Sequence, residues 1–280
     1  MSKSEFSIAD TYDKDGFVFP INVLSTAQAN TVLQDLEAAE AELSNDAEKL
    51  ALLRSYPDRL LPSFDDLIRN PMLVNAASQI LGPDLMVWSA ALFIKEPQTT
   101  HIVSWHQDLT YWGLDDAQET TGWVALSAAT IESGCMQFVP GTHKQLQVPH
   151  EDTFDKNNLL SRGQEIAVEV AEGDGVAVEL KPGQASLHHG HLFHSSGPNQ
   201  ARHRRVGAAI RYIKPSMKQR TGDKPLVALV SGVDNFNHFN IAQPPKQRLL
   251  ESDFLLCKQD AEIKRRVLYQ GAEDQSGQRY

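Results

Sequence analysis

Cysteine is scarce in this sequence, which holds only Cys135 and Cys257 among its 280 residues. Two thiols are too few for a disulfide framework or a cysteine-rich zinc site. No apolar run approaches the roughly 20 residues that a membrane-spanning helix requires. Residues 1–17 also contain no apolar stretch of the kind that forms the centre of a signal peptide. These absences predict a cytoplasmic protein without a membrane partner.

Basic residues are also in the minority. The sequence has 26 Lys and Arg residues against 36 Asp and Glu residues, which gives a net charge of -10. A net acidic surface argues against nucleic acid as a partner and against a polybasic contact with a membrane. It does not exclude a small anionic ligand, because a pocket can be basic while the whole protein is acidic. The hydrophobic share of 41% excludes wholesale disorder.

The first third of the sequence carries helical patterns. Ser25 is a suitable N-cap for a helix over residues 26–43, in which apolar residues form one stripe. Apolar residues at helical spacing predict a second helix over 62–81, and the Gly-Pro pair that follows ends it. A further helix is expected over 251–267. Amphipathic helices of this kind need a surface on which to pack.

From Leu85 onward the pattern changes to short apolar runs separated by turn residues. Many short strands after a helical segment predict a mainly β protein, an antiparallel sandwich or barrel with helices packed outside. We find no linker and expect one domain over 1–280, with a mainly helical part (1–84), a β core (85–214) and a C-terminal extension (215–280). The expected strands cover 86–95, 103–112, 122–131, 136–139, 165–170, 185–189 and 206–213.

His106 and Asp108 form the first group of residues with metal-binding chemistry. They are two positions apart in the predicted strand 103–112, so both side chains would leave the same face. An imidazole and a carboxylate on one face can occupy two adjacent positions of a divalent metal ion. A hydrogen-bonded pair at the end of a strand is the alternative explanation of so short a motif.

Four of the ten histidines fall within residues 188–194. One of them could join His106 and Asp108 in a set of two histidines and one carboxylate. Such a set leaves metal positions open and is typical of non-haem Fe(II) oxygenases. The pattern alone does not decide which histidine would coordinate, and a cluster of surface or core histidines would look the same. The four are His188, His189, His191 and His194.

Arginines lie at both ends of the segment 205–211, which is expected to be a strand. Alternation along it places Arg205, Gly207, Ala209 and Arg211 on one face. A guanidinium group directed into a barrel needs an anion, because an unpaired buried charge is costly. A carboxylate fits the planar guanidinium best. A solvated basic patch is the alternative interpretation.

Several longer motifs carry a resemblance to a known family. They extend over most of the chain, and the glycine-rich and histidine-containing ones are far more specific than a His-x-Asp pair. On these motifs the sequence resembles the phytanoyl-CoA dioxygenase-like family of Fe(II)/2-oxoglutarate-dependent oxygenases, in particular its bacterial small-molecule hydroxylases. The motifs are DGFV (15–18), FIKEP (93–97), WHQDL (105–109), GCMQFVPGTHK (134–144) and HSSGPN (194–199).

The resemblance implies a double-stranded β-helix (jelly roll, cupin-like) core, with Fe(II) as the metal and 2-oxoglutarate and O₂ as co-substrates. It implies that His106, Asp108 and His194 are the metal ligands, since His194 alone precedes the family's Ser-Gly-x-Asn turn. Arg205 corresponds to the arginine that binds the distal carboxylate of 2-oxoglutarate, with the Ser196 hydroxyl beside it. The remaining positions near 2-oxoglutarate in relatives correspond to Trp123, Ala91 and Phe93.

The reaction that the resemblance implies is hydroxylation of a small molecule, with release of succinate and CO₂. Related halogenases have a small residue in place of the metal-binding carboxylate, so the presence of Asp108 favours hydroxylation. Two competing hypotheses come from other classes. One is a non-catalytic jelly roll that binds a metal or ligand, and the other is a zinc hydrolase of cupin-like shape.

Substrate contacts are less sharply marked. Tyr111 and Trp112 follow the metal motif, where relatives place aromatic substrate contacts, although plain core packing explains them equally well. Arg211 could bind a second anion or form a structural salt bridge. Asp234 and His238 lie in a stretch that resembles one in bacterial relatives, and it could cover the mouth of the site or be a surface loop. The expected substrate is an amino-acid derivative, a betaine-like compound or an aminoalkylphosphonate, and the oligomeric state stays open.

Overall fold

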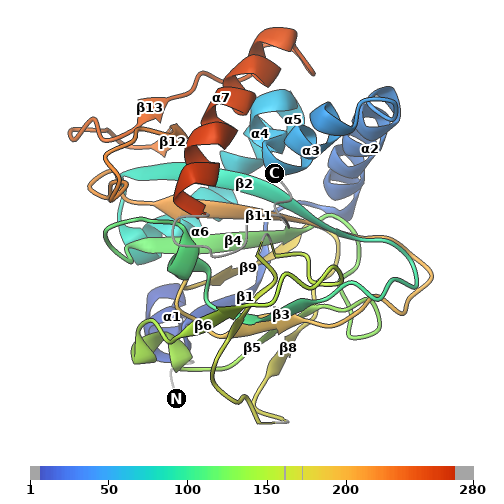
Figure 1. The fold of residues 1–280 in the computed structure, drawn as a ribbon, viewed down its shortest axis with the longest axis vertical. Coiled ribbons are helices and arrows are strands. Elements are labelled where there is room, and N and C mark those ends of the chain that lie inside the picture. Colours follow the sequence, from blue (N-terminus) through green and yellow to red (C-terminus); the bar gives the residue numbers. More distant parts are fainter. Residues whose placement is uncertain (1–6, 161, 172, 269–280) are drawn as a thin grey trace, which may run out of the picture.

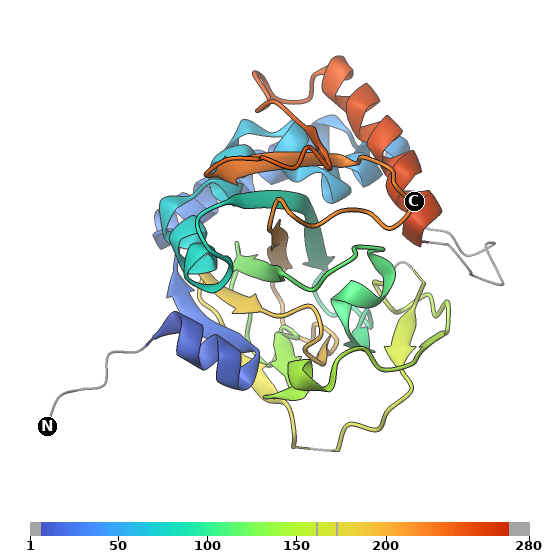
Figure 2. The ribbon, with the colours of Figure 1, turned by 90° about the vertical axis from the view of Figure 1, so that its left-hand side faces the viewer.

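Two β-sheets lie face to face, and helices cover the outer face of the larger one (Figure 1, Figure 2). The computed structural model describes residues 7–160, 162–171 and 173–268. Every ladder of the larger sheet in these residues is antiparallel except the one between its last two strands. In spatial order it contains β1 (Phe17–Asn22), β9 (Gln184–His188), β4 (Glu119–Ala125), β11 (Arg205–Ile213), β2 (Leu85–Lys95), β12 (Leu226–Ser231) and β13 (Asn240–Ile241).

The smaller sheet closes the other side of the core. Its ladders are antiparallel, and a separate short hairpin flanks it. Two packed, mainly antiparallel sheets with helices outside confirm the predicted mainly β class and the jelly-roll core. The smaller sheet contains β3 (Val103–His106), β10 (His194–Ser196), β5 (Met136–Phe138) and β8 (Val176–Val178), and the hairpin pairs β6 (His150–Asp152) with β7 (Gln164–Ile166).

Most helices precede the strands, as the sequence predicts. The helix over 26–43 is confirmed, and it begins at a capping box in which Ser25 and Gln28 satisfy each other's backbone N–H groups. None of the described helices is both long and apolar enough to cross a membrane. The helices are α1 (Ile8–Asp15), α2 (Thr26–Glu42), α3 (Ala47–Ser55), α4 (Pro57–Leu60), α5 (Pro62–Ile68), α6 (Pro71–Leu81) and α7 (Glu251–Leu268).

The single helix predicted over 62–81 is wrong, because the structure divides it into α5 and α6. Asn70 precedes a proline, which disfavours helical backbone at that position. Its side chain accepts a hydrogen bond from the Met72 N–H at 2.9 Å, so Asn70 is the N-cap of α6. Pro71 then occupies the first helical position, where its missing N–H costs nothing.

The strand predicted over 103–112 is also wrong in its second half. β3 ends at His106, and the short 3₁₀ helix η1 (Asp108–Tyr111) follows. The strands expected at 86–95, 136–139, 185–189 and 206–213 are confirmed to within one residue at each end. The expectations at 122–131 and 165–170 run beyond the observed ends of β4 and β7.

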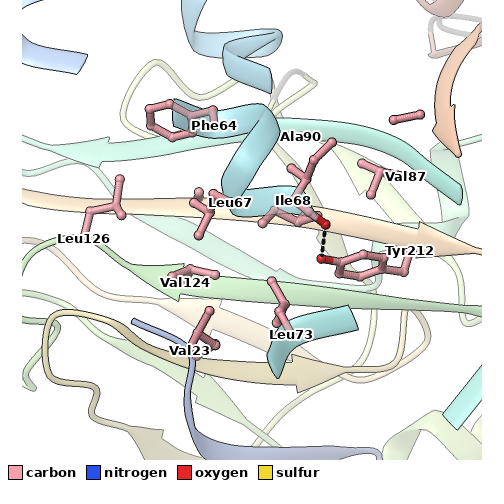
Figure 3. Packing of buried hydrophobic residues seen from close by; sticks show 14 of the residues in the cluster. Val23, Phe64, Leu67, Ile68, Leu73, Val87, Ala90, Val124, Leu126 and Tyr212 are labelled. Carbon is pink, nitrogen blue, oxygen red and sulfur yellow. Dashed lines mark hydrogen bonds between the residues drawn. The ribbon is translucent and has the colours of Figure 1, made fainter. Parts of the chain in front are cut away.

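The main hydrophobic core lies between the helices and the outer face of the larger sheet (Figure 3). Apolar residues of α5 and α6, among them Phe64 and Leu73, pack there against alternate residues of the strands. The Tyr212 hydroxyl of β11 donates a hydrogen bond to the Ile68 carbonyl at 2.9 Å, which joins the sheet to the end of α5.

A second apolar cluster, which includes Trp123, Phe138 and Ala209, lies between the two sheets. The two faces of β11 therefore lie in different environments. Val206, Ala208 and Ile210 belong to the helix-covered core, whereas Arg205, Ala209 and Arg211 line the pocket between the sheets. The alternation predicted for this strand is confirmed, and it brings the charged face to the candidate site.

Candidate metal centre

His106, Asp108 and His194 come together between the sheets. His106 ends β3 and His194 begins β10, and the two residues are direct partners in the antiparallel ladder. Their ring centroids are 4.0 Å apart, and the Asp108 Oδ1 atom is 3.4 Å from His106 Nε2. One ligand atom from each of the three side chains lies within 4.8 Å of the other two. No other group of His, Cys, Asp and Glu in the described parts of the chain has this metal-binding geometry.

Backbone carbonyls orient both imidazole rings. The Nδ1 atoms of His106 and His194 each lie 2.9 Å from a carbonyl oxygen, that of Ser104 and that of Leu192. A proton on Nδ1 leaves the Nε2 lone pair free to coordinate a metal ion. Burial, with the neighbouring His106 and His188, holds the pKa of His194 well below its usual value, so this ring stays neutral.

Asp108 supplies the negative charge. Burial alone would raise its pKa, but the adjacent His106 and His188 rings, together with the charge of Arg211, hold the pKa well below its usual value. The site thus offers two imidazole nitrogens and one carboxylate oxygen. Such a donor set fits a divalent metal with open coordination positions, as in non-haem Fe(II) sites.

The turn after β3, rather than a shared strand face, directs Asp108 to the metal centre. Gln107 lies between the two ligands and is fully buried. Its side-chain amide donates to the carbonyls of Leu146 and His191, at 2.5 and 2.8 Å, and its oxygen accepts from the Val148 N–H at 2.9 Å. These bonds tie three loops together where η1 begins.

Among the four clustered histidines, the geometry selects His194. His188 is the nearest of the others, with its ring centroid 4.8 Å from that of His194 and its Nε2 atom 3.9 Å from Asp108 Oδ2. Both ring nitrogens of His188 are buried without a hydrogen-bond partner. His189 and His191 point elsewhere, with their rings 5.3 Å apart and outside the metal-binding group.

Arg205 faces the same pocket as the three ligands. Its Nη1 atom donates to the Gly134 carbonyl at 2.9 Å and to the Ser196 hydroxyl at 3.3 Å, and its guanidinium lies 5.2 Å from the centre of the Trp123 ring. The Nε atom is buried without a partner. Burial lowers the pKa of Arg205 to about 10, and no described carboxylate forms an ion pair with it. A buried, uncompensated guanidinium fits one carboxylate of a ligand.

The phytanoyl-CoA dioxygenase (PhyH) family model matches residues 12–207, a span that contains all three candidate ligands and Arg205. The chain belongs to this family. A solved structure of the family's fold, the apo form of the non-heme monooxygenase ThoJ, is 31% identical. The similarity covers 94% of this chain and 98% of ThoJ, with a TM-score of 0.85.

Two curated relatives are similar over a shorter stretch. A Caenorhabditis elegans protein named "Probable phytanoyl-CoA dioxygenase" is 26% identical over 65% of this chain. A Stutzerimonas stutzeri protein named "Probable alpha-ketoglutarate-dependent hypophosphite dioxygenase" is 27% identical, also over 65% of this chain. The matched stretches span 60% and 64% of these relatives' own lengths.

Lys95 is a residue of this phytanoyl-CoA dioxygenase-family site that the sequence analysis missed. It is fully buried and lies opposite Arg205 in the ladder between β2 and β11. Its Nζ atom lies 3.1 Å from the Ser196 carbonyl oxygen and also contacts the Ser196 hydroxyl and the Gly197 carbonyl. Burial and then the charge of Arg205 lower the pKa of Lys95 to about 6. Alternation along β2, which points Phe93 and Lys95 to the same face, was the available signal.

Gly207 makes room for Trp123. A Cβ atom added at Gly207 would lie 1.9 Å from Trp123 Cζ2, so any larger residue on this inward-facing position would displace the indole. Phe93 lines the metal pocket with Trp123 and Ser196. Ala91 instead lines a neighbouring cavity, which begins at Phe93, Asp108 and Arg211.

Three of the predicted substrate contacts also line the neighbouring cavity, namely Tyr111, Trp112 and Arg211. The structure does not bring Asp234 and His238 to either pocket. Asp234 accepts hydrogen bonds from backbone N–H groups of its own turn, and the His238 Nδ1 atom lies 3.1 Å from the Met217 carbonyl.

Proposed function

We propose that this chain is an Fe(II)- and 2-oxoglutarate-dependent dioxygenase that hydroxylates a small-molecule substrate, with release of succinate and CO₂. One observation carries the proposal. A His-Asp-His donor set with two buried histidines and a buried arginine without an anion face the same pocket. The first fits a divalent iron and the second fits the free carboxylate of 2-oxoglutarate.

His106, Asp108 and His194 would hold the metal. Their two imidazole nitrogens and one carboxylate would leave half of the positions of an octahedral metal ion open. Fe(II) with 2-oxoglutarate and O₂ would supply the oxidative chemistry. The protein's own contribution is geometric. The carbonyls of Ser104 and Leu192 fix the two rings, and the surrounding imidazoles with the charge of Arg211 hold the pKa of Asp108 well below its usual value.

Arg205, Ser196 and Trp123 would hold the distal carboxylate of 2-oxoglutarate. The guanidinium offers its unpartnered Nε–H, the Ser196 hydroxyl lies beside it, and Trp123 covers its face. Phe93 forms an apolar wall of the same pocket. Excluding water in this way strengthens the ion pair, because the local dielectric constant is low. Asp108 in the ligand set favours hydroxylation over halogenation.

The remaining parts of the proposal concern the whole protein. The names of the relatives are consistent with small-molecule substrates, such as hypophosphite for the Stutzerimonas stutzeri protein. Cys135 and Cys257 are both buried free thiols, in keeping with a reducing cytoplasm. β1 and β12 join the same sheet as the central strands, which supports one domain that includes the N- and C-terminal parts.

Anaerobic titration of Fe(II) into the protein with 2-oxoglutarate tests the proposal. A visible charge-transfer band is expected from an Fe(II)–2-oxoglutarate chelate. His194→Ala should abolish the band, whereas His191→Ala, from the same segment but outside the ligand set, should retain it. Iron binding without a band in the unmodified protein would contradict the proposal and favour a non-catalytic binding role.

A further inference from the structure

A cavity of about 540 Å³ adjoins the metal pocket. It lies between β2 on one side and helices α3 and α7, which contact each other, on the other. Its inner end is formed by Phe93, Asp108 and Arg211, which the metal pocket shares. At its outer end, the exposed side chains of Glu48 and Lys258 form an ion pair of 2.5 Å that links α3 to α7. A volume of this size is typical of sites for drug-sized ligands.

Three residues that line this cavity each have a buried polar atom without a hydrogen-bond partner. These atoms are the donors Arg211 Nε and Trp88 Nε1 and the acceptor Gln219 Oε1. Buried polar atoms are nearly always hydrogen-bonded in folded proteins, so each orphan needs an explanation. Such residues around one mainly apolar cavity favour a ligand that has polar as well as apolar groups.

Arg211 is a cation of this cavity that forms no direct ion pair, although its charge acts on the nearby carboxyl groups of Asp108 and Glu119. Lys264, on α7, is paired with Asp260 at 2.8 Å and donates to the Trp88 carbonyl at 3.1 Å. Arg211 is 9% exposed, and its one hydrogen bond from the guanidinium goes to the neutral Ser89 hydroxyl at 3.2 Å. No carboxylate in the described ranges forms an ion pair with it.

Arg205 and Arg211 cannot serve the same carboxylate. They are six residues apart on β11, which separates their Cα atoms by about 20 Å. Arg205, beside Ser196, belongs to the far end of the metal pocket, whereas Arg211 marks the border with the larger cavity. An anion at Arg211 is therefore a second one, distinct from the co-substrate's distal carboxylate.

Aromatic surface lies next to this cation. Trp88 and Trp112 stack with ring centroids 5.1 Å apart, and the Arg211 guanidinium lies 5.0 Å from the Trp112 ring centre. This cation–π contact places the guanidinium over the indole, and its remaining N–H groups can bind a carboxylate. The body of a ligand bound there would run along apolar and aromatic walls toward the α3–α7 rim.

We infer that the prime substrate is an amphiphilic carboxylic acid, with its carboxylate on Arg211 near the iron and an apolar body in the 540 Å³ cavity. This rests on the proposed function and narrows it. The substrate is larger than the amino-acid-sized metabolites that the sequence analysis expects, because such molecules would leave most of an apolar cavity unfilled.

Isothermal titration calorimetry on the full chain tests the inference with three probes. The first, 6-phenylhexanoate, has both the carboxylate and the apolar body. The second, 6-phenylhexan-1-ol, keeps the body without the charge, and propionate keeps the charge without the body. We expect one 6-phenylhexanoate to bind per chain, at least about 10-fold more tightly than either other probe, since hydrogen bonds to charged groups and apolar burial both contribute.

Variants of Arg211 test whether the carboxylate of the probe binds to this residue. Arg211→Gln should weaken 6-phenylhexanoate about 10- to 100-fold and leave 6-phenylhexan-1-ol unchanged. Arg211→Lys is the second variant. It keeps the charge but loses the paired N–H donors of the guanidinium, so it should weaken the binding of 6-phenylhexanoate by less. Arg202→Gln, an exposed arginine before β11, is the matched control and should change nothing.

Acid and alcohol that bind equally, or an Arg211→Gln variant that binds 6-phenylhexanoate as well as the unmodified protein does, would overturn the inference. The Fe(II)–2-oxoglutarate band separates this failure from that of the proposed function. A band without probe binding overturns only the substrate class. Probe binding that depends on Arg211, without a band, supports the cavity assignment and overturns the dioxygenase.

Discussion

Arg205 and Lys95 lie directly opposite each other on β11 and β2, as two buried basic side chains that no described carboxylate neutralises. Lys95 resolves the conflict by losing its proton, since its pKa is lowered to about 6. Arg205 stays charged at neutral pH, because its lowered pKa is still about 10. The pocket thus holds one permanent cation beside a neutral amine that positions Ser196.

Arg205→Gln should raise the KM for 2-oxoglutarate about 10- to 100-fold, because it removes a charge-assisted pair with the distal carboxylate. The effect on kcat should be smaller, since the metal ligands are untouched. Succinate formation at increasing 2-oxoglutarate concentration measures both. Arg202→Gln is the control, and an unchanged KM in Arg205→Gln would contradict the assignment.

Lys95 should make the protein more stable as pH rises. An unfolded lysine has a pKa near 10.4, so between about pH 6 and that value the unfolded chain holds a proton that the folded protein lacks. The free energy of unfolding therefore increases with pH in this window, by at most about 1.4 kcal/mol per pH unit. This gain in the free energy of unfolding is lost as pH falls toward 6.

Urea denaturation at several pH values across this window measures the slope. Lys95→Met should remove the contribution of this residue, because Met is apolar and of similar length. Lys181→Met, at an exposed position, should leave the slope unchanged. Identical slopes in the Lys95→Met and unmodified proteins would show that Lys95 keeps its proton in the fold.

Gly207→Ala should disturb the co-substrate pocket without touching a metal ligand. The added methyl group would lie 1.9 Å from Trp123, so the indole must move away from Arg205. Overpacking of this kind costs about 1 to 3 kcal/mol of stability, and the KM for 2-oxoglutarate should rise as well. Thermal denaturation and steady-state kinetics measure the two effects.

Gly197→Ala is the matched control for this substitution. It adds the same methyl group beside the same pocket, but no atom lies within 4 Å of the new Cβ. Stability and KM should both stay close to those of the unmodified protein. Equal behaviour of the two alanine variants would refute the steric argument.

Asp108→Ala should abolish metal-dependent stabilisation. Ligand binding to the folded state alone adds about 2.7 kcal/mol when the free metal is 100 times its Kd, so Fe(II) under anaerobic conditions should raise the Tm of the unmodified protein. Without Asp108 only the two histidines of the ligand set remain. Asp66→Ala, at an exposed position on α5, should keep the full rise in Tm. A rise that survives Asp108→Ala would place the metal elsewhere.

Local patterns along the chain predicted much of the fold. The capping signal at Ser25, the alternation through β11 and the turn residues between short runs depend only on near neighbours, and the structure confirms them. The helix predicted over 62–81 and the strand predicted over 103–112 were wrong for two different reasons. Asn70 before a proline was a visible break, whereas the end of β3 at His106 follows from the loops that Gln107 holds.

The sequence by itself determined the chemistry of the site, because the residue types and motifs that bind a metal and a carboxylate are legible without coordinates. Only the tertiary structure decided which groups meet. The ladder between β3 and β10 selects His194 from four histidines, and the ladder between β2 and β11 places Lys95 against Arg205. The cavity beside Arg211 exists because α3 and α7, about 200 residues apart in the chain, close over β2. Register and packing between distant segments depend on the whole buried surface, so no short pattern encodes them.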